Sequence, residues 1–252
     1  MSRNTLTTVK ADARIQRCAI NDPFKNYKPE SEQITRKFEV KESKALKQLK
    51  DTFLDLKKYD LDYDEKAAAI ASKLRPSSRD IMNFSMVLAE FQNIKEFSRQ
   101  SGLFMNALMN SSKDTEFTVV TQHLDMPVNY LCQGNKKNVI VEGDVWGWFG
   151  QGMEKGTTVV KGNAGMALGE WMRGGTIIVE GNVTEACLGK EMSNGKIIVK
   201  GNVLGEPGHG MWNGEIHIQG ECEDRFLKEN RIGGSIYHKG KLIVKNGKFI
   251  EK

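Results

Sequence analysis

The side chains that could bind a ligand or react lie mostly in the second half of the chain, within short glycine-rich segments. His209, in the segment Glu206–Gly210, could serve as a general acid or base. A turn stiffened by Pro207 accounts for the same segment without any chemistry. Together with the aromatic residues of neighbouring turns, His209 forms a candidate surface for a partner subunit. The members of this candidate surface are Trp146, Trp148, Phe149, Trp171, His209 and Trp212. Core or edge packing is the alternative interpretation of the aromatic residues.

Other patterns that often carry chemistry are absent from the sequence. The cysteines are scattered, with no C-x-x-C pair and no accompanying histidine cluster, so they predict reduced and mostly buried thiols. They are Cys18, Cys132, Cys187 and Cys222. The glycine-rich stretch Gly147–Gly152 could cradle a phosphate, but no P-loop Lys-Ser/Thr follows it, so we interpret its glycines as turn residues. We therefore predict no catalytic, cofactor-binding or metal-binding residue in this chain.

The elements that must position these residues repeat every 19 or 20 residues. Fixed-period self-similarity is typical of a stacked solenoid. Four copies are plain: Asn138–Gly156, Thr157–Gly175, Thr176–Gly195 and Lys196–Gly214. A fifth copy begins at Glu215 and a degenerate sixth at Ser235. Phe117–Thr121 is a strand candidate about one period earlier, with Val120 placed 21 residues before Val141, and could be an imperfect first coil.

Each repeat begins with an apolar strand that alternates between two faces. Positions such as Val139 and Val141 recur as Val or Ile and predict an interior face, with Ile140 pointing the opposite way. Because the opposite positions are also apolar, that face is either buried or forms a binding surface. The recurring methionines Met153, Met172, Met192 and Met211 are predicted to fill the other side of the interior.

The residue before the first glycine of each repeat alternates in charge. This position holds Glu142, Lys161, Glu180, Lys200, Gln219 and Lys239. If coils stack in register about 4.8 Å apart, opposite charges become neighbours and form a ladder. The ladder would oppose a slip of one coil, which would bring like charges together. Gly-Asn pairs after the strands, such as Gly162-Asn163, indicate turns that tolerate positive φ.

The region before the repeats is helical in pattern. Residues 1–40 are predicted to be an extended arm. One helix starts at Glu42 and carries an apolar stripe from Leu46 to Leu56. A second spans Glu65–Leu74 and stops before Pro76, and a third runs from Arg79 to about Ser98 with Ser77 or Ser78 as its cap. Gly102 is predicted to end or interrupt this helix.

Composition limits the class of protein. The formal net charge of +5, from 37 basic and 32 acidic side chains, is too small to indicate nucleic-acid binding by itself. The sequence contains no run of about 18 apolar residues, so it predicts no membrane span. The first residues lack the apolar core of a secretory signal, so we expect a cytoplasmic protein.

The repeat resembles the GXGXG domain family. Gly162–Gly181 (GNAGMALGEWMRGGTIIVEG) matches the pattern G-N-x-G-x-x-x-G-x-x-M-x-G-G-x-I-x-V-x-G, and the resemblance covers residues 120–252. This family includes the C-terminal β-helix of the glutamate synthase large subunit and one of the subunits of formylmethanofuran dehydrogenase. Together with the coil length, the resemblance predicts a mainly β fold: a right-handed parallel β-helix with 19–20 residues per coil, preceded by a small α-helical region.

The resemblance also implies a function. It indicates a non-catalytic structural subunit of a glutamate synthase-like oxidoreductase complex. The resemblance does not extend to residues 1–115; the residue pattern divides the chain into an arm (1–40), a helical region (41–115) and the GXGXG-like domain (116–252). No cofactor is expected in this chain, whereas flavin and iron–sulfur groups are expected on partner subunits. A subunit of a formylmethanofuran dehydrogenase-like complex is the alternative, and a homo-oligomer is also compatible. A stand-alone or polymerising solenoid and a carbohydrate-active β-helix enzyme are alternatives of other classes.

Overall fold

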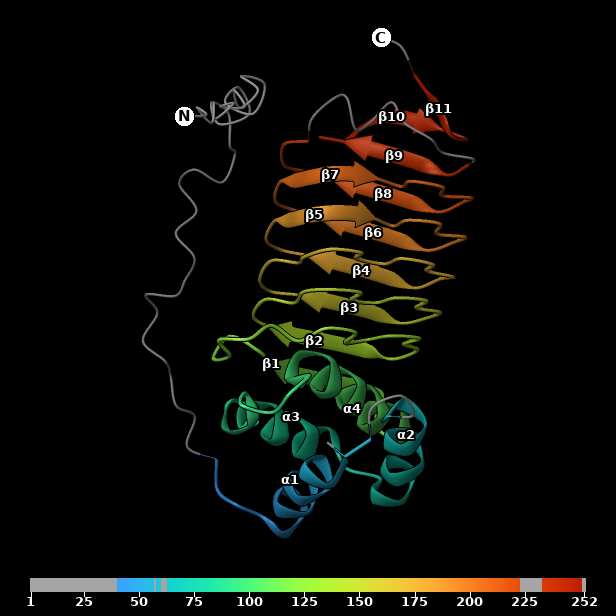
Figure 1. Cartoon of the computed structure of the whole chain (residues 1–252). Helices are drawn as coiled ribbons and strands as arrows, with labels where there is room; N and C mark the ends of the chain where they lie inside the picture. Colours follow the sequence, from blue (N-terminus) through green and yellow to red (C-terminus); the bar gives the residue numbers. More distant parts are fainter. Residues whose placement is uncertain (1–39, 57, 60–62, 223–232, 251–252) are drawn as a thin grey trace, which may run out of the picture. The chain divides into compact units, whose positions relative to one another are not determined.

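The computed structural model describes residues 40–56, 58–59, 63–222 and 233–250, with the backbone alone for residues 185–186 (Figure 1). All of these residues belong to one compact unit. The predicted arm, residues 1–40, lies outside the described residues except for Val40. None of the helices in the described ranges is long and apolar enough to cross a membrane.

A group of helices comes first in this unit. They are α1 (Lys44–Leu56), α2 (Tyr63–Leu74), α3 (Ser78–Met86), the short 3₁₀ helix η3 (Leu88–Phe91) and α4 (Phe97–Ser111). The predicted stripe on α1 is confirmed: Leu46, Leu49, Phe53 and Leu56 are all buried. Ser77 caps α3 through a capping box, because its hydroxyl accepts from the Asp80 N–H while the Asp80 carboxylate accepts from the Ser77 N–H.

The predicted third helix is wrong in its length. α3 ends at Met86, η3 follows, and α4 begins only at Phe97, after Glu96 in the left-handed conformation (φ 61°). Gly102 does not end a helix but lies inside α4. A Cβ at this position would come within 1.8 Å of the Asn129 carbonyl oxygen, so glycine lets α4 approach the first coil of the solenoid.

The strands build a parallel β-solenoid, so the predicted fold class is confirmed. One sheet contains, in spatial order, β1 (Glu116–Val120), β2 (Asn138–Glu142), β3 (Thr157–Val160), β4 (Thr176–Val179), β6 (Lys196–Val199), β8 (Glu215–Ile218) and β9 (Ser235–His238), all paired in parallel. We call it the main sheet. The returning sides of two coils form a second parallel sheet, β5 (Val183–Leu188) with β7 (Val203–Pro207).

The first coil confirms the predicted strand but not its register. Val119, rather than Val120, pairs with Val141, so the first coil is longer than the repeats that follow. The Val120 N–H donates to the Ser85 hydroxyl of α3 (2.9 Å). A backbone group at the outer edge of β1 is therefore hydrogen-bonded to a helix instead of to another strand. Helix α3 therefore closes the solenoid at this end.

The interior follows the predicted alternation. The strand positions of the main sheet that were assigned to the core are buried, from Val139 and Val141 through Ile216 and Ile218. The four recurring methionines are also fully buried. At the far end, β10 (Lys241–Lys245) and β11 (Lys248–Phe249) pair antiparallel after β9, so the parallel stack stops there (Figure 1).

The asparagines after the first glycine have a role that differs from the predicted one. Their φ angles are not positive. Instead, each side-chain oxygen accepts a hydrogen bond from the backbone N–H of the next coil. The Asp144 side-chain oxygen accepts from the Asn163 N–H (2.7 Å), and the Asn163 oxygen accepts from the Asn182 N–H (2.9 Å). In the same way the Asn182 oxygen accepts from the Asn202 N–H (2.8 Å), and the Asn202 oxygen accepts from the Glu221 N–H (2.8 Å). We call this column the asparagine ladder.

Two clusters of partly buried hydrogen bonds join the helices to the first coil. Lys137 donates through Nζ to the carbonyl oxygens of Met109, Ser112 and Asp114, at 2.7–2.9 Å. A cation at this position stabilises the carboxyl end of α4, and burial lowers the pKa of the Lys137 amine. Asn106 of α4 donates to the Tyr130 carbonyl and accepts from the Cys132 N–H. These contacts fix the helices to the solenoid.

Candidate functional site

Trp146, from the proposed partner surface, is half-buried against the next coil. An ideal Cβ on Gly165 would lie 2.5 Å from the Trp146 ring, so the indole rests directly on a residue without a side chain. The glycine at 165 provides the space for this contact. Trp146 therefore packs between neighbouring coils and presents only part of its ring to solvent.

Trp148 is half-buried against the coil on the other side. Its ring stacks on Tyr130 with centroids 4.8 Å apart and planes inclined by 2°. The residue adopts a left-handed backbone conformation (φ 56°), which turns the chain at this corner. Phe149 is fully buried in the core and cannot belong to an exposed surface, a correction to its predicted place. It was misassigned because an interior position falls directly beside an outward one at the turn.

Trp171 and Trp212 are the tryptophans that face solvent. Trp171 is 48% exposed and Trp212 is 61% exposed. The Trp171 indole N–H donates to the Glu191 carboxylate of the next coil (3.0 Å), which orients the ring while leaving much of it accessible. Large aromatic side chains at this exposure are typical of protein interfaces. We call this pair the corner tryptophans.

His209 lies at the same corner region and is paired with a carboxylate. Its Nδ1 is 3.2 Å from a Glu206 oxygen, and both side chains are partly exposed. Glu206 lies in β7 opposite Cys187 of β5, whose thiol is exposed. The histidine thus has an orienting partner. No group of three or more His, Cys, Asp or Glu side chains in the described ranges could hold a metal ion.

The other described thiols are in the core. Cys132 and Cys222 are buried. Burial raises the pKa of the Cys132 thiol to about 12, so it stays protonated at neutral pH. Cys18 lies outside the described residues. The burial of these two thiols agrees with the prediction, whereas the exposed Cys187 departs from it.

The alternating charges form the expected ladder on the outside of the main sheet. Lys161 lies between Glu142 and Glu180 across the coils, because the Lys161 N–H bonds the Val141 carbonyl and the Glu180 N–H bonds the Val160 carbonyl, directly after the paired strands. Its amine is 3.1 Å from a Glu180 oxygen, and Lys200 approaches the same oxygen to 3.0 Å. These hydrogen bonds, with Lys200 the larger cause, lower the pKa of Glu180. Lys239 departs from the ladder and pairs with Glu221 instead.

The outward apolar positions of the main sheet are partly exposed. Ile140 is 40% exposed, and the equivalent residues Val159, Ile178 and Ile198 are half-buried. The column continues to His217 and Tyr237, whose rings stack 4.4 Å apart. We call the four aliphatic members of this column, Ile140, Val159, Ile178 and Ile198, the aliphatic stripe. The alternation of the sequence predicted that this face was either covered or a binding surface.

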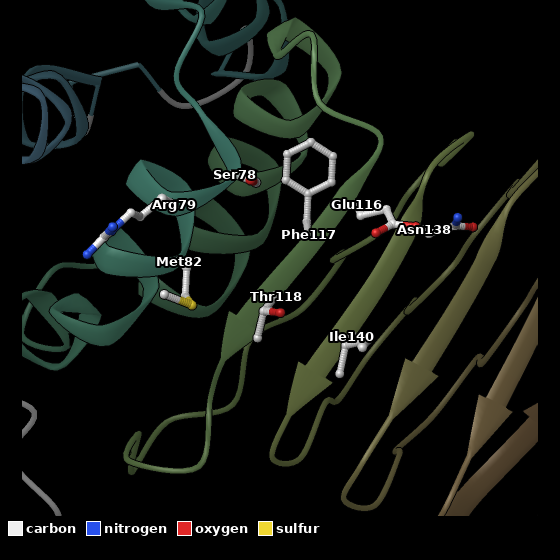
Figure 2. Close-up of a pocket in the computed structure, with 8 residues that line it drawn as sticks. All are labelled: Ser78, Arg79, Met82, Glu116, Phe117, Thr118, Asn138 and Ile140. Carbon is white, nitrogen blue, oxygen red and sulfur yellow. The ribbon is translucent and has the colours of Figure 1, made fainter.

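A groove of about 400 Å³ lies where the stripe meets the helices. Its floor is formed by β1 and β2, including Thr118 and Ile140, and its wall by Arg79 and Met82 of α3 (Figure 2). The Thr118 and Ile140 side chains point the same way from adjacent strands (Figure 2). Sequence reasoning missed this groove, because α3 and β2 are far apart in the chain and no short motif connects them.

Comparisons with known proteins do not place the chain further: no family model, no curated protein and no solved structure matches it.

Proposed function

We propose that this β-solenoid is a non-catalytic structural subunit that binds a partner protein through the corner tryptophans. The observation that carries the proposal is the use of the repeated residues. The repeated methionines fill the core, the asparagine ladder links the coils, and Lys161 and Lys200 of the charge ladder pair with Glu180. The corner tryptophans belong to none of these three sets; although the Trp171 indole N–H bonds to Glu191 of the next coil, both rings expose large apolar area, which favours burial against another protein.

The finer proposal is that the partner belongs to a glutamate synthase-like oxidoreductase complex. It rests on the resemblance of Gly162–Gly181 to the GXGXG repeat. On this proposal the partner subunits carry the flavin and iron–sulfur groups, and the solenoid holds them at a fixed separation. A formylmethanofuran dehydrogenase-like complex is the alternative context for the same role, and the test below distinguishes the two by the identity of the captured subunits.

Two functions of other classes have less support. End-to-end polymerisation requires open sheet edges, but α3 covers β1 and the antiparallel strands β10 and β11 follow β9. A carbohydrate-active site requires carboxylates gathered in a groove. The groove beside α3 contains a single carboxylate, Glu116, among its described lining residues.

Purification of the tagged full-length chain from its native cells tests the proposal. We expect a stoichiometric complex whose partner subunits absorb visible light from flavin or iron–sulfur groups. The double variant Trp171→Ala/Trp212→Ala should lose the partner, whereas Met126→Ala, which removes another exposed apolar side chain, should retain it. Equal capture by the tryptophan variant would reject the proposed surface, and enzymatic turnover by the chain alone would reject the non-catalytic role.

A further inference from the structure

The outer face of the main sheet combines the aliphatic stripe with the charge ladder over the same four coils. In each coil the ladder residue follows the stripe residue by two positions, as the last residue of β2 or directly after β3, β4 and β6. Backbone hydrogen bonds from the N–H groups of Lys161, Glu180 and Lys200 to the preceding coil continue the strand pairing through this position, so the stripe and ladder side chains leave the same face. We propose that this face binds the same face of a second copy of the chain, with the two stacks running in opposite directions. This inference concerns a different surface from the corner tryptophans and does not depend on the proposed function.

The charge pattern is what identifies a second copy as the occupant. The ladder reads Glu142, Lys161, Glu180, Lys200 along the stack. Reversal of this order puts a lysine opposite every glutamate. With a twofold axis parallel to the strands and midway between β3 and β4, Lys161 of one copy faces Glu180 of the other. The same operation places Glu142 opposite Lys200. An even, alternating ladder is thus complementary to its own reversed copy, as an isologous interface requires.

The aliphatic stripe obeys the same symmetry. Val159 of one copy lies opposite Ile178 of the other, and Ile140 lies opposite Ile198. On the flank away from the ladder, Thr157 meets Thr176 and Asn138 meets Lys196, so no like charges meet within the four coils. β-Branched side chains from two sheets packed about 10 Å apart interdigitate well. The half-exposed apolar area of both copies is then removed from water.

The groove beside α3 also acquires an occupant in this arrangement. The coil of His217 falls opposite the coil of Thr118, so the stacked rings of His217 and Tyr237 in the second copy come to the groove wall formed by α3. At this margin Glu116 faces Glu215. Glu215 is already held by Lys196 at 2.8 Å and by His217 at 2.9 Å, which reduces the repulsion.

The size of the face indicates a weak, reversible interface. Strands about 4.8 Å apart and about five residues long give a contact that extends roughly 30 Å along the stack and 16 Å across it. That is on the order of 500 Å² per copy, below the roughly 800 Å² of a standard stable interface. We therefore expect a reversible dimer with a Kd in the micromolar range, whose population depends on protein concentration.

A charge-exchange experiment tests the pairing. Sedimentation velocity is measured on the full-length chain at concentrations of about 10–100 µM. Lys161→Glu alone places glutamates opposite each other in a homodimer, and Glu180→Lys alone places lysines opposite each other. Each variant alone should dimerise at least about tenfold more weakly than the wild type. In an equimolar mixture, the two variants present only opposite charges to each other, so the mixed dimer should form with near wild-type affinity.

Controls separate the proposal from effects on folding. Lys161 and Glu180 are partly exposed, and thermal unfolding of each variant shows whether it remains folded. Arg173→Glu makes an equal charge reversal at an exposed position outside the main sheet and should leave dimerisation unchanged. Ile178→Lys should abolish the dimer, because it buries two cations beside the twofold axis. A wild-type chain that stays monomeric at the highest concentration would overturn the proposal, as would a mixture that associates no better than its components.

Discussion

At the scale of single residues, this chain uses polar side chains mainly to join one coil to the next. The asparagine ladder is the clearest case, because each amide oxygen meets a backbone N–H that lacks a strand partner at that corner. A buried or half-buried N–H without an acceptor costs more than an exposed one. The same column holds Asp144 in one coil, which shows that an oxygen acceptor is the required chemistry.

Substitution of Asn182 tests the asparagine ladder. Asn182→Ala removes the acceptor of the Asn202 N–H, and we expect a loss of about 1–2 kcal/mol in the free energy of unfolding. Asn182→Asp retains an oxygen at this position and should remain within about 0.5 kcal/mol of the wild type. Denaturant unfolding gives both values. An equal loss in the two variants would mean that the amide acts through something other than its acceptor oxygen.

The contribution of the charge ladder to the stability of the folded state depends on pH. Its hydrogen bonds to Lys200 and Lys161 hold the pKa of Glu180 below the ordinary value of 4.5. Because the folded pKa is the lower one, the stabilisation is complete above the unfolded pKa and is lost as the pH falls through the folded pKa. Glu180→Gln should therefore lower Tm slightly at neutral pH, and this difference should vanish well below pH 4.5. Glu142→Gln is the matched control in the same column, and a difference for Glu180→Gln that persists unchanged into acid would contradict this account.

At the scale of the element, a coil is stable only within the stack. Each coil buries a few aliphatic side chains and one methionine, while ordering all of its residues has a large entropic cost. Met172 is fully buried in the middle of the stack, between the coils of Met153 and Met192. Its thioether reaches Gly195, where an added Cβ would lie 2.8 Å from the Met172 methyl carbon. The methionines therefore pack against the glycines of the following coil.

Truncation of this methionine measures how far the stack depends on one coil. Met172→Ala should cost about 2–5 kcal/mol, from lost burial and the cavity left behind. Met172→Leu, which keeps most of the volume, should cost less than about 1.5 kcal/mol. The thermal transition should stay single in both variants because neighbouring coils unfold together. A shift in Tm of less than a degree for Met172→Ala would show that the cavity closes by repacking.

Periodic features were predictable from the sequence because each recurs in several copies of the repeat. The core positions of the main sheet, the methionines and the charge ladder all followed from the repeat. Contacts made once, between distant segments, carried no such signal: Lys137 at the end of α4, and Gly102 against Asn129, are examples. For the same reason, the sequence did not distinguish the half-buried tryptophans from the exposed ones. Trp146 is half-buried against Gly165 and Trp148 against Tyr130, and both contacts are made with neighbouring coils.

At the scale of the whole described unit, the helices and the solenoid share one apolar core. The core runs without interruption from Phe53 and Phe104 in the helices, through Phe117 in β1, to Val139 and the later coils. The helical end is built on four packed aromatic rings. The centroid of the Phe53 ring lies 5.4–5.7 Å from the ring centroids of Phe84, Phe91 and Phe104. A continuous core of this kind predicts that the two regions unfold as one cooperative unit.

The placement of the tryptophans makes this cooperativity measurable. All four tryptophans lie in the solenoid, whereas Phe53 lies in α1, so tryptophan fluorescence reports on a region of the fold other than the helix that carries this side chain. Phe53→Ala should destabilise the protein by about 3–5 kcal/mol. We expect the fluorescence transition and the helical circular dichroism transition to move together to lower denaturant concentration. If the circular dichroism transition moved alone, the helices would be a separate folding unit attached to an independently stable solenoid, and the shared core would contribute little to the coupling between them.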